Sequence, residues 1–409
     1  MTNNNQHIPS GYKSSPLGII PEDWEVKRLG EIARIGSGGT PSKANQEYWG
    51  GNIPWITTAL LNNPYIDAVD EFITEQGLKN SSAQLLNSGV LLMAMYGQGQ
   101  TRGKVSKLLI KASTNQACAF IDIHTGNTDF VHQHLIADYD SIRNKSNDGN
   151  QKNLSLGIIN DIQITFPPIP EQQRIVSLLS LWDTAIEKQT VLIEKLTLRK
   201  RGLMQQLLTG KKRLEGFSGE WKEVRLGDVF DERNETNCNN LPLLSITGDK
   251  GVIYQSESDK RDISNEDKSK YKRICPNDIG YNTMRMWQGR SALSGLEGIV
   301  SPAYTIVTPK GNIDVRFMAM LIQQPRIVYD FWTHSQGLVS DTLNCKYPDF
   351  SQVKVSIPSK EEQTAVANFF VELDKEIELA NKKLARLQEE KRGLMQVLLT
   401  GKKRIINKI

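Results

Sequence analysis

Two glycine-studded turns carry the side chains of this sequence that are best suited to contacting another molecule. The first turn, in the stretch YGQGQTRGK, offers Tyr96, Gln98, Gln100, Arg102 and Lys104, and the second, in YNTMRMWQGR, offers Asn282, Arg285, Trp287, Gln288 and Arg290. Arginine and lysine suit guanine edges and phosphates, glutamine and asparagine suit adenine, and the aromatic rings add flat faces beside them. A solvated hairpin tip is the alternative interpretation, and the recurrence of the turn favours binding. Thr40 and Lys43, in the stretch GGTPSK, complete the candidate set.

Residue patterns that would indicate catalysis are hard to find in this sequence. It contains neither the D-P-P-Y nor the N-P-P-Y motif of an amino-methyltransferase, and GSGGTPSK lacks the spacing of a phosphate-binding loop. His132 and His134 could form a metal pair on a strand, but no further ligand cluster lies nearby in the sequence. The chain is therefore predicted to be a binder without metal or catalytic residues. An enzyme with an unrecognised site, such as a stand-alone nuclease, is the competing hypothesis.

The composition limits the number of domains and the cellular location that can be expected for the chain. Its 409 residues suggest two or three domains. No apolar run is long enough to span a membrane and the first fifteen residues are polar, so a cytoplasmic location without membrane contact is expected. The four cysteines form no C-x-x-C pair, which predicts reduced, mostly buried thiols. The net charge of +4 leaves the partner open.

An internal repeat frames both halves of the sequence. Residues 200–213 (KRGLMQQLLTGKKR) and 391–404 (KRGLMQVLLTGKKR) agree at thirteen of fourteen positions, 191 residues apart. Upstream, Glu171-Gln172 falls on Glu362-Gln363 at the same offset, and a second match relates DWEVKRLGEI to EWKEVRLGDV. The segments that lie between these matches show no visible similarity between the two halves of the sequence. We therefore expect two modules that perform the same task on different targets.

The repeated segments predict two long helices. Alternate steps of four and three residues from Ile175 meet eight apolar residues in ten, and those from Val366 meet nine, with Lys200 and Lys391 as the shared exception. Prolines precede the first helix, Ser359 and Glu362 form a capping-box pattern before the second, and both helices end at Thr-Gly. At about 38 residues each helix would measure roughly 57 Å.

Two apolar stripes of that length most simply pair with each other in antiparallel orientation, and an ordinary core helix in each domain is the alternative. Close approach of a neighbouring backbone, or a tolerated surface position, would explain Gly202 and Gly393. The residues assigned to helix pairing or partner docking are Trp182, Leu196, Leu203, Leu207, Leu373, Leu387, Leu394 and Leu398.

The predicted fold class is α+β, with two β-rich modules, two long helices forming an antiparallel coiled coil and a pseudo-twofold internal repeat. Residues 89–111 and 278–293 each read as a hairpin, with two apolar runs around a turn. The predicted boundaries are 1–166 for the first module, 167–212 for the first helix, 213–357 for the second module and 358–409 for the second helix.

Several of these motifs together resemble the specificity subunit of a Type I restriction-modification system. The stretches GGTPSKANQEYWGGNIPWIT, STNQACAF and GIVSPAYTIV are typical of that family's recognition domains, and the PxxxEQ-helix-GLMQxLLTGKKR frame is typical of its spacers. The resemblance implies two target recognition domains, each reading one half of an interrupted DNA sequence.

The resemblance also implies partners. Two modification subunits would bind S-adenosylmethionine and methylate adenine, restriction subunits with motor and nuclease activity would join for cleavage, and the chain itself would bind double-stranded DNA without a cofactor or enzymatic activity of its own. A non-catalytic coiled-coil scaffold with two β-rich protein-binding modules is the alternative function.

Overall fold

The computed structural model describes residues 8–97, 100–145, 153–248, 250–258, 266–337 and 343–405. The chain divides into two compact units, and both dividing points lie inside long helices. The first unit comprises residues 1–190 and 383–409, and the second comprises residues 191–382. None of the described helices combines the length and apolarity that a membrane crossing requires.

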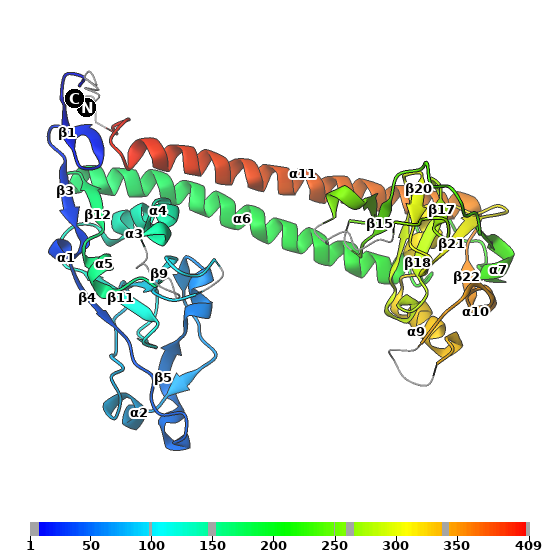
Figure 1. The fold of residues 1–409 in the computed structure, drawn as a ribbon, viewed down its shortest axis with the longest axis horizontal. Helices are drawn as coiled ribbons and strands as arrows, with labels where there is room; N and C mark the ends of the chain where they lie inside the picture. Colours follow the sequence, from blue (N-terminus) through cyan, green and yellow to red (C-terminus); the bar gives the residue numbers. More distant parts are fainter. Residues whose placement is uncertain are drawn as a thin grey trace. The chain divides into compact units, whose positions relative to one another are not determined.

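The first unit is built on a five-stranded sheet with the order β4-β11-β8-β9-β6. Its strands β4, β9 and β11 are labelled in Figure 1. Three smaller sheets, β10-β5-β7, β12-β3 and β1-β2, accompany it. The strands are β1 (Tyr12–Ser15), β2 (Gly18–Pro21), β3 (Glu25–Arg28), β4 (Ala33–Ser37), β5 (Trp49–Ile56), β6 (Tyr65–Ile66), β7 (Phe72–Ile73), β8 (Leu91–Ala94), β9 (Val105–Leu108), β10 (Ser113–Thr114), β11 (Cys118–Ile123) and β12 (Gln163–Phe166). The short helices are α1 (Leu29–Ile32), η1 (Gln46–Tyr48), η2 (Thr58–Asn62), α2 (Glu75–Lys79), α3 (Thr128–Ala137), α4 (Tyr139–Asn144) and α5 (Leu156–Asn160).

The second unit is built on a four-stranded sheet with the order β14-β21-β18-β19. The pairs β13-β22, β15-β16 and β17-β20 complete its strands. These are β13 (Lys222–Arg225), β14 (Phe230–Glu232), β15 (Leu244–Ile246), β16 (Val252–Tyr254), β17 (Lys272–Ile274), β18 (Ile279–Asn282), β19 (Ser291–Leu293), β20 (Gly298–Val300), β21 (Tyr304–Pro309) and β22 (Lys354–Ile357). The short helices are α7 (Leu226–Val229), η3 (Gln255–Glu257), η4 (Met286–Gln288), α8 (Val315–Leu321), α9 (Pro325–His334) and α10 (Tyr347–Gln352).

The repeat extends into segments where the sequences show no match. β4-β11-β8-β9 and β14-β21-β18-β19 have the same order, and each sheet follows the same short β-α-β opening. Both predicted hairpins are present, because β8 pairs with β9 and β18 pairs with β19, each in antiparallel orientation. The two modules therefore share a fold as well as a frame.

Two 39-residue helices, α6 (Ile169–Leu207) and α11 (Lys360–Leu398), run through both units and lie within the longer segments 167–212 and 358–409 that were assigned to the helices. In the first unit, Ile175 and Leu179 of α6 share an apolar cluster with Met395 and Leu398 of α11. In the second unit, Leu207 of α6 packs in one cluster with Phe370 and other residues of α11. The start of each helix thus meets the end of the other, as an antiparallel pair requires.

The ends of α6 and α11 show which of the predicted start and stop signals are used. Gly210 and Gly401 adopt the left-handed conformation (φ 69° and 72°) that ends each helix. At the start of α11 the Ser359 hydroxyl accepts a hydrogen bond from the amide of Glu362 at 3.4 Å. The carboxylate of Glu362 does not complete the predicted capping box, because it pairs with Arg213 instead.

The Glu-Gln pair of each repeat fixes the helix to its module. Gln172 accepts from the amide of Asn127 at 2.8 Å and donates to the carbonyl of Pro167 at 2.8 Å. At the equivalent place Gln363 accepts from the amide of Asp314 at 3.0 Å, and its side-chain amide donates to the Pro358 carbonyl. Asn127 and Asp314 cap the helices α3 and α8. The repeated glutamine therefore ties each long helix to the helix that follows the sheet.

Of the two explanations offered for the helix glycines, the described structure agrees with a tolerated surface position and not with close packing of a neighbouring backbone. A Cβ atom built at Gly202 or Gly393 would meet no atom within 4 Å. Both positions are exposed, so no neighbour within the described chain requires a glycine there.

Candidate nucleic-acid interface

The turn of the second module is held by its own backbone. The amide of Arg285 donates to the Asn282 carbonyl at 3.0 Å, and the amide of Gln288 donates to the Arg285 carbonyl at 2.9 Å. Gly289 takes the left-handed conformation (φ 72°), which turns the chain into β19. The indole of Trp287 donates to the Met284 carbonyl at 3.0 Å and so closes the tip. The side chains at this turn therefore project from a well-defined backbone.

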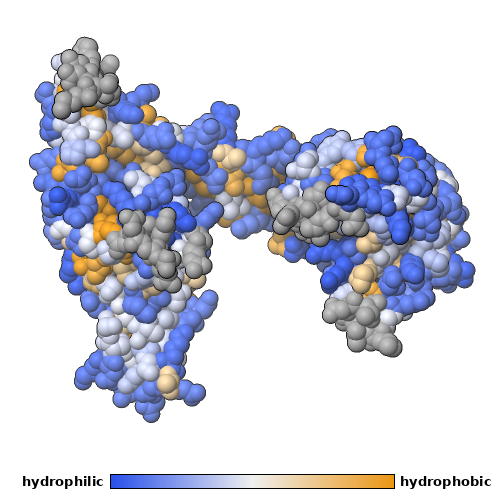
Figure 2. Space-filling view, viewed as in Figure 1, coloured by the Kyte–Doolittle hydropathy of each residue, from blue (hydrophilic) through white to orange (hydrophobic). Residues whose placement is uncertain are grey.

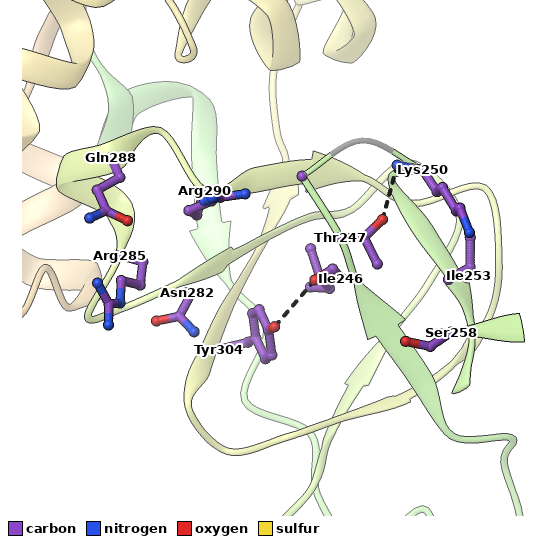
Figure 3. A pocket seen from close by; sticks show the side chains of 11 residues that line it. Ile246, Thr247, Lys250, Ile253, Ser258, Asn282, Arg285, Gln288, Arg290 and Tyr304 are labelled. Atoms are coloured by element: carbon purple, nitrogen blue, oxygen red, sulfur yellow. Dashed lines mark hydrogen bonds between the residues drawn. The ribbon is translucent and has the colours of Figure 1, made fainter. Parts of the chain in front are cut away.

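This turn forms one wall of a cavity of about 610 Å³, and the β15–β16 hairpin forms the other (Figure 3). Four predicted residues, Asn282, Arg285, Gln288 and Arg290, line the cavity together. Trp287 does not line it, because its ring is directed into the turn. The remaining lining residues are Ile246, Thr247, Gly248, Lys250, Ile253, Ser258 and Tyr304.

The cavity is rich in positive charge. Lys250, Arg285 and Arg290 line it, and none of the described lining residues is acidic. Arg285 and Arg290 are exposed, and no described side chain binds either guanidinium. Burial raises the pKa of Tyr304, which therefore stays a neutral hydroxyl and donates to the Ile246 carbonyl at 3.4 Å. The arrangement suits an anionic or acceptor-rich ligand.

The hairpin residues of this cavity escaped the sequence-based site prediction. The available signal was the stretch TGDKG between the apolar runs LLSI and VIY, which is the pattern of a tight hairpin. In the structure the Thr247 hydroxyl accepts from the amide of Lys250 at 3.0 Å, which orders this turn. Lys250 thereby lines the cavity from the hairpin side, while Arg285 and Arg290 line it from the turn (Figure 3).

The candidate residues of the first module are not gathered in one cavity. Tyr96 and Gln100 are exposed, whereas the Lys104 ammonium donates to the Asn62 side chain at 2.8 Å. Arg102 is only 9% exposed and donates to the Arg143 carbonyl at 3.4 Å, so it is not presented at the surface. Gln98 lies outside the described residues.

Thr40 and Lys43 lie on a different part of the first module. The Thr40 hydroxyl donates to the side chain of Gln116, and the Lys43 ammonium lies 5.6 Å from the centre of the Trp49 ring. A smaller hollow of about 300 Å³ is lined by Lys104, Asn62 and Tyr139 among others. The DNA-contacting roles of all these residues stay predictions.

The proposed histidine pair is not on a strand. His132 and His134 lie on helix α3, both are buried, and His134 is within 2.9 Å of Asp138. Within the described residues no group of three or more possible metal ligands occurs. The strong helix start at Asn127, whose side chain caps two amides, explains why this segment is helical.

The helix residues assigned to pairing or partner docking fall into a buried group and a half-buried group. Leu196, Leu207, Leu373 and Leu398 are buried, and Trp182, Leu203, Leu387 and Leu394 are half-buried. A further set of leucines, missed by the stepping pattern, is exposed on the outside: Leu181, Leu192, Leu198 and Leu379. Hydrophobic residues accordingly reach the surface along the helices (Figure 2).

Two modules of one fold, each fixed to the same pair of helices, define a protein built as an internal repeat. The chain belongs to the family described as Type I restriction modification DNA specificity domain, whose model matches residues 21–197 and 218–389. It is thus a specificity subunit of the Type I restriction-modification class, concerned with DNA target recognition.

Individual proteins that are similar to this chain are specificity subunits of the same class. The MjaIX specificity subunit of Methanocaldococcus jannaschii is 31% identical over 257 residues, which cover 56% of each chain. The MjaVIII specificity subunit of the same organism is 23% identical over 429 residues, or 95% of each chain. One similar solved structure is described as the structural basis underlying complex assembly and conformational transition of the type I R-M system. Its matching chain has a TM-score of 0.59 and 15% sequence identity, and the match covers 94% of this chain and 99% of that chain.

Proposed function

We propose that this chain is the non-catalytic DNA-binding subunit of a Type I restriction-modification complex, and that each module reads one half of a bipartite target. The observation that carries the proposal is one fold present twice with different surface residues. The same strand order supports a cationic cavity in the second module and a different distribution of polar residues in the first. Modules of that kind suit two unequal half-sites on one duplex.

The helices are proposed to set the distance between the half-sites. At about 1.5 Å per residue, a 39-residue helix measures roughly 58 Å, and half-sites one DNA turn apart are separated by about 34 to 36 Å. The ion pairs of Glu362 with Arg213 and of Glu171 with Arg404, which link the start of each helix to the segment after the end of the other, would hold the two helices in register.

Two modification subunits are proposed to dock on the repeated helix ends, bringing S-adenosylmethionine and the methylating site with them. Restriction subunits would join this complex for cleavage. The supporting observation is a nearly identical sequence that presents exposed residues, including Gly202 and Gly393, at two equivalent places. Two copies of one surface suit two copies of one partner.

A module exchange tests the proposal. Residues 20–165 are replaced by the first recognition domain of another family member, and methylated adenines are mapped in cells that carry the hybrid and the modification subunit. One half of the methylated motif should change, while the other half and the gap between them stay the same. A change in both halves would contradict modular reading.

A binding assay separates this function from the protein-scaffold alternative. Gel shifts with total genomic fragments are measured for the chain with and without the modification subunit, at 50 and 200 mM salt. Binding to DNA should weaken steeply with salt, because each phosphate contact releases counterions. Absence of a shift under every condition would favour a scaffold.

A further inference from the structure

We infer that the cavity of the second module reads a guanine in its half-site, with Arg285 and Arg290 as the base-contacting donors and Gly248 as the residue that positions Arg290. The inference rests on the proposed function, because it names what this module recognises. It also brings the β15–β16 hairpin, which carries Gly248 and Lys250, into the recognition site.

The chemistry of the lining favours guanine over adenine and cytosine. In the major groove guanine presents two acceptors, O6 and N7, whereas adenine presents one acceptor and one donor and cytosine presents a donor. The cavity offers the guanidinium groups of Arg285 and Arg290, which donate hydrogen bonds and cannot accept one from cytosine. The planar fork of arginine matches O6 and N7 together, which makes it the commonest reader of guanine.

The two arginines differ from the other candidate arginine of the molecule in availability. Arg102 is buried and bonded to the Arg143 carbonyl, whereas Arg285 and Arg290 are exposed at the cavity. The backbone bonds between Asn282 and Arg290 fix the positions from which both side chains start. Little main-chain ordering is then required on binding, which leaves more of the contact energy for discrimination.

Gly248 sets where the Arg290 guanidinium lies. A Cβ atom built at Gly248 would be 2.3 Å from the Arg290 Nη1 atom, which is closer than any real contact. The obstructed atom is the end of a flexible side chain, so alanine at this position would displace the guanidinium and leave the fold in place. Gly248→Ala therefore changes the geometry of the cavity without changing its charge.

Lys250 supplies a matched control on the opposite wall. A compact ammonium suits a phosphate, which carries no sequence information, and the loop of Lys250 is ordered by Thr247. Loss of Lys250 should weaken binding to every sequence alike, whereas loss of an arginine should relax one position of the target.

The experiment uses the complete modification complex and the target defined by methylation mapping. Affinity is measured for duplexes in which each guanine of the half-site is replaced, one at a time, by 7-deazaguanine, which lacks the N7 acceptor. One substitution should weaken binding of the wild-type complex about tenfold or more. Arg285→Ala, Arg290→Ala and Gly248→Ala should each bind the natural target about 5- to 150-fold more weakly and lose discrimination at that same guanine. Lys250→Ala should keep the discrimination and reduce the salt slope by about one.

Each contrary result has a distinct meaning. A half-site without guanine overturns the inference at once. Arginine variants that weaken binding uniformly and flatten the salt slope identify phosphate contacts and also overturn it, as does unchanged discrimination. In all of these cases the proposed function stands as long as the wild-type complex prefers its own target over a scrambled duplex. Loss of that preference would instead refute the proposed function.

Discussion

At the scale of single residues, two buried carboxylates explain why the Glu-Gln pair recurs. Glu171 and Glu362 are each 2% exposed, and Arg404 and Arg213 neutralise them. Glu171 also accepts from the indole of Trp24 at 3.0 Å. A buried carboxylate needs such partners because an unpaired charge in the interior is costly. The repeated tail therefore supplies the arginine that the start of the other helix requires.

His132 leads to a prediction about pH. Burial lowers its pKa to about 4, whereas a histidine in the unfolded chain titrates near 6.5. The Tyr65 ring and the ion pair of Lys107 with Asp129 are its neighbours. Between these two pKa values only the unfolded chain binds the proton, so the free energy of unfolding falls as the pH drops from about 6.5 to about 4. The loss amounts to about 3 kcal/mol at the lower limit.

The test compares urea unfolding of the wild type and His132→Leu at pH 7 and pH 4.5. The variant should lose less stability over this interval, because the group that binds the extra proton is gone. His334→Leu, which changes an exposed histidine, should keep the wild-type pH dependence. Identical pH profiles for wild type and His132→Leu would show that the buried imidazole is not responsible.

At the scale of elements, the lysine that interrupts each apolar stripe forms an ion pair between the helices. Lys391 lies 2.6 Å from Asp183, and Lys200 pairs with Asp374 at the equivalent position. The first pair is more buried, with side chains 12% and 28% exposed against 25% and 56%. A polar pair within an apolar seam fixes the register at which two helices meet.

Charge reversal tests this register role. Lys391→Glu should lower the free energy of unfolding by about 1–2 kcal/mol, and Lys200→Glu should lower it by less because that pair is more exposed. Adding Asp183→Lys to Lys391→Glu should restore part of the loss, measured by urea unfolding of both single variants and the double variant. Simply additive losses would mean that the pair contributes no coupling.

The elements also show what the sequence could and could not predict. The long helices and both hairpins were predictable because their signals are local: an apolar stripe with a terminal Thr-Gly, or two apolar runs around a glycine turn. The shared strand order of the two sheets was not visible, because strand pairing depends on burial and long-range backbone bonds, which unrelated side chains can satisfy. For the same reason the sequence predicted only one wall of the cavity. Residues 282–290 form one continuous turn, whereas Lys250 lies at the same cavity only because the fold places the β15–β16 hairpin there.

At the scale of the whole molecule, the repeat predicts two equivalent docking places. Residues 200–213 and 391–404 are nearly identical although they serve modules with different surfaces. Internal contacts account for part of this identity, since Lys200, Arg213, Lys391 and Arg404 form the ion pairs between the helices. These ion pairs do not account for Gly202 and Gly393, because a Cβ atom built at either position would meet no atom within 4 Å. We therefore expect a partner to approach the helix backbone closely at both glycines.

Alanine at these positions should separate stability from assembly. Gly202→Ala and Gly393→Ala should each raise the free energy of unfolding of the chain by up to about 1 kcal/mol, because glycine is the poorer helix former. Each should also weaken assembly with the modification subunit at its own docking place, so that one variant yields a complex with a single modification subunit and the double variant yields none. Sedimentation of the mixed proteins measures the stoichiometry, and Thr197→Ala provides an exposed control on α6 that should assemble normally. A stabilised double variant that still binds two modification subunits would place the docking surface elsewhere on the molecule.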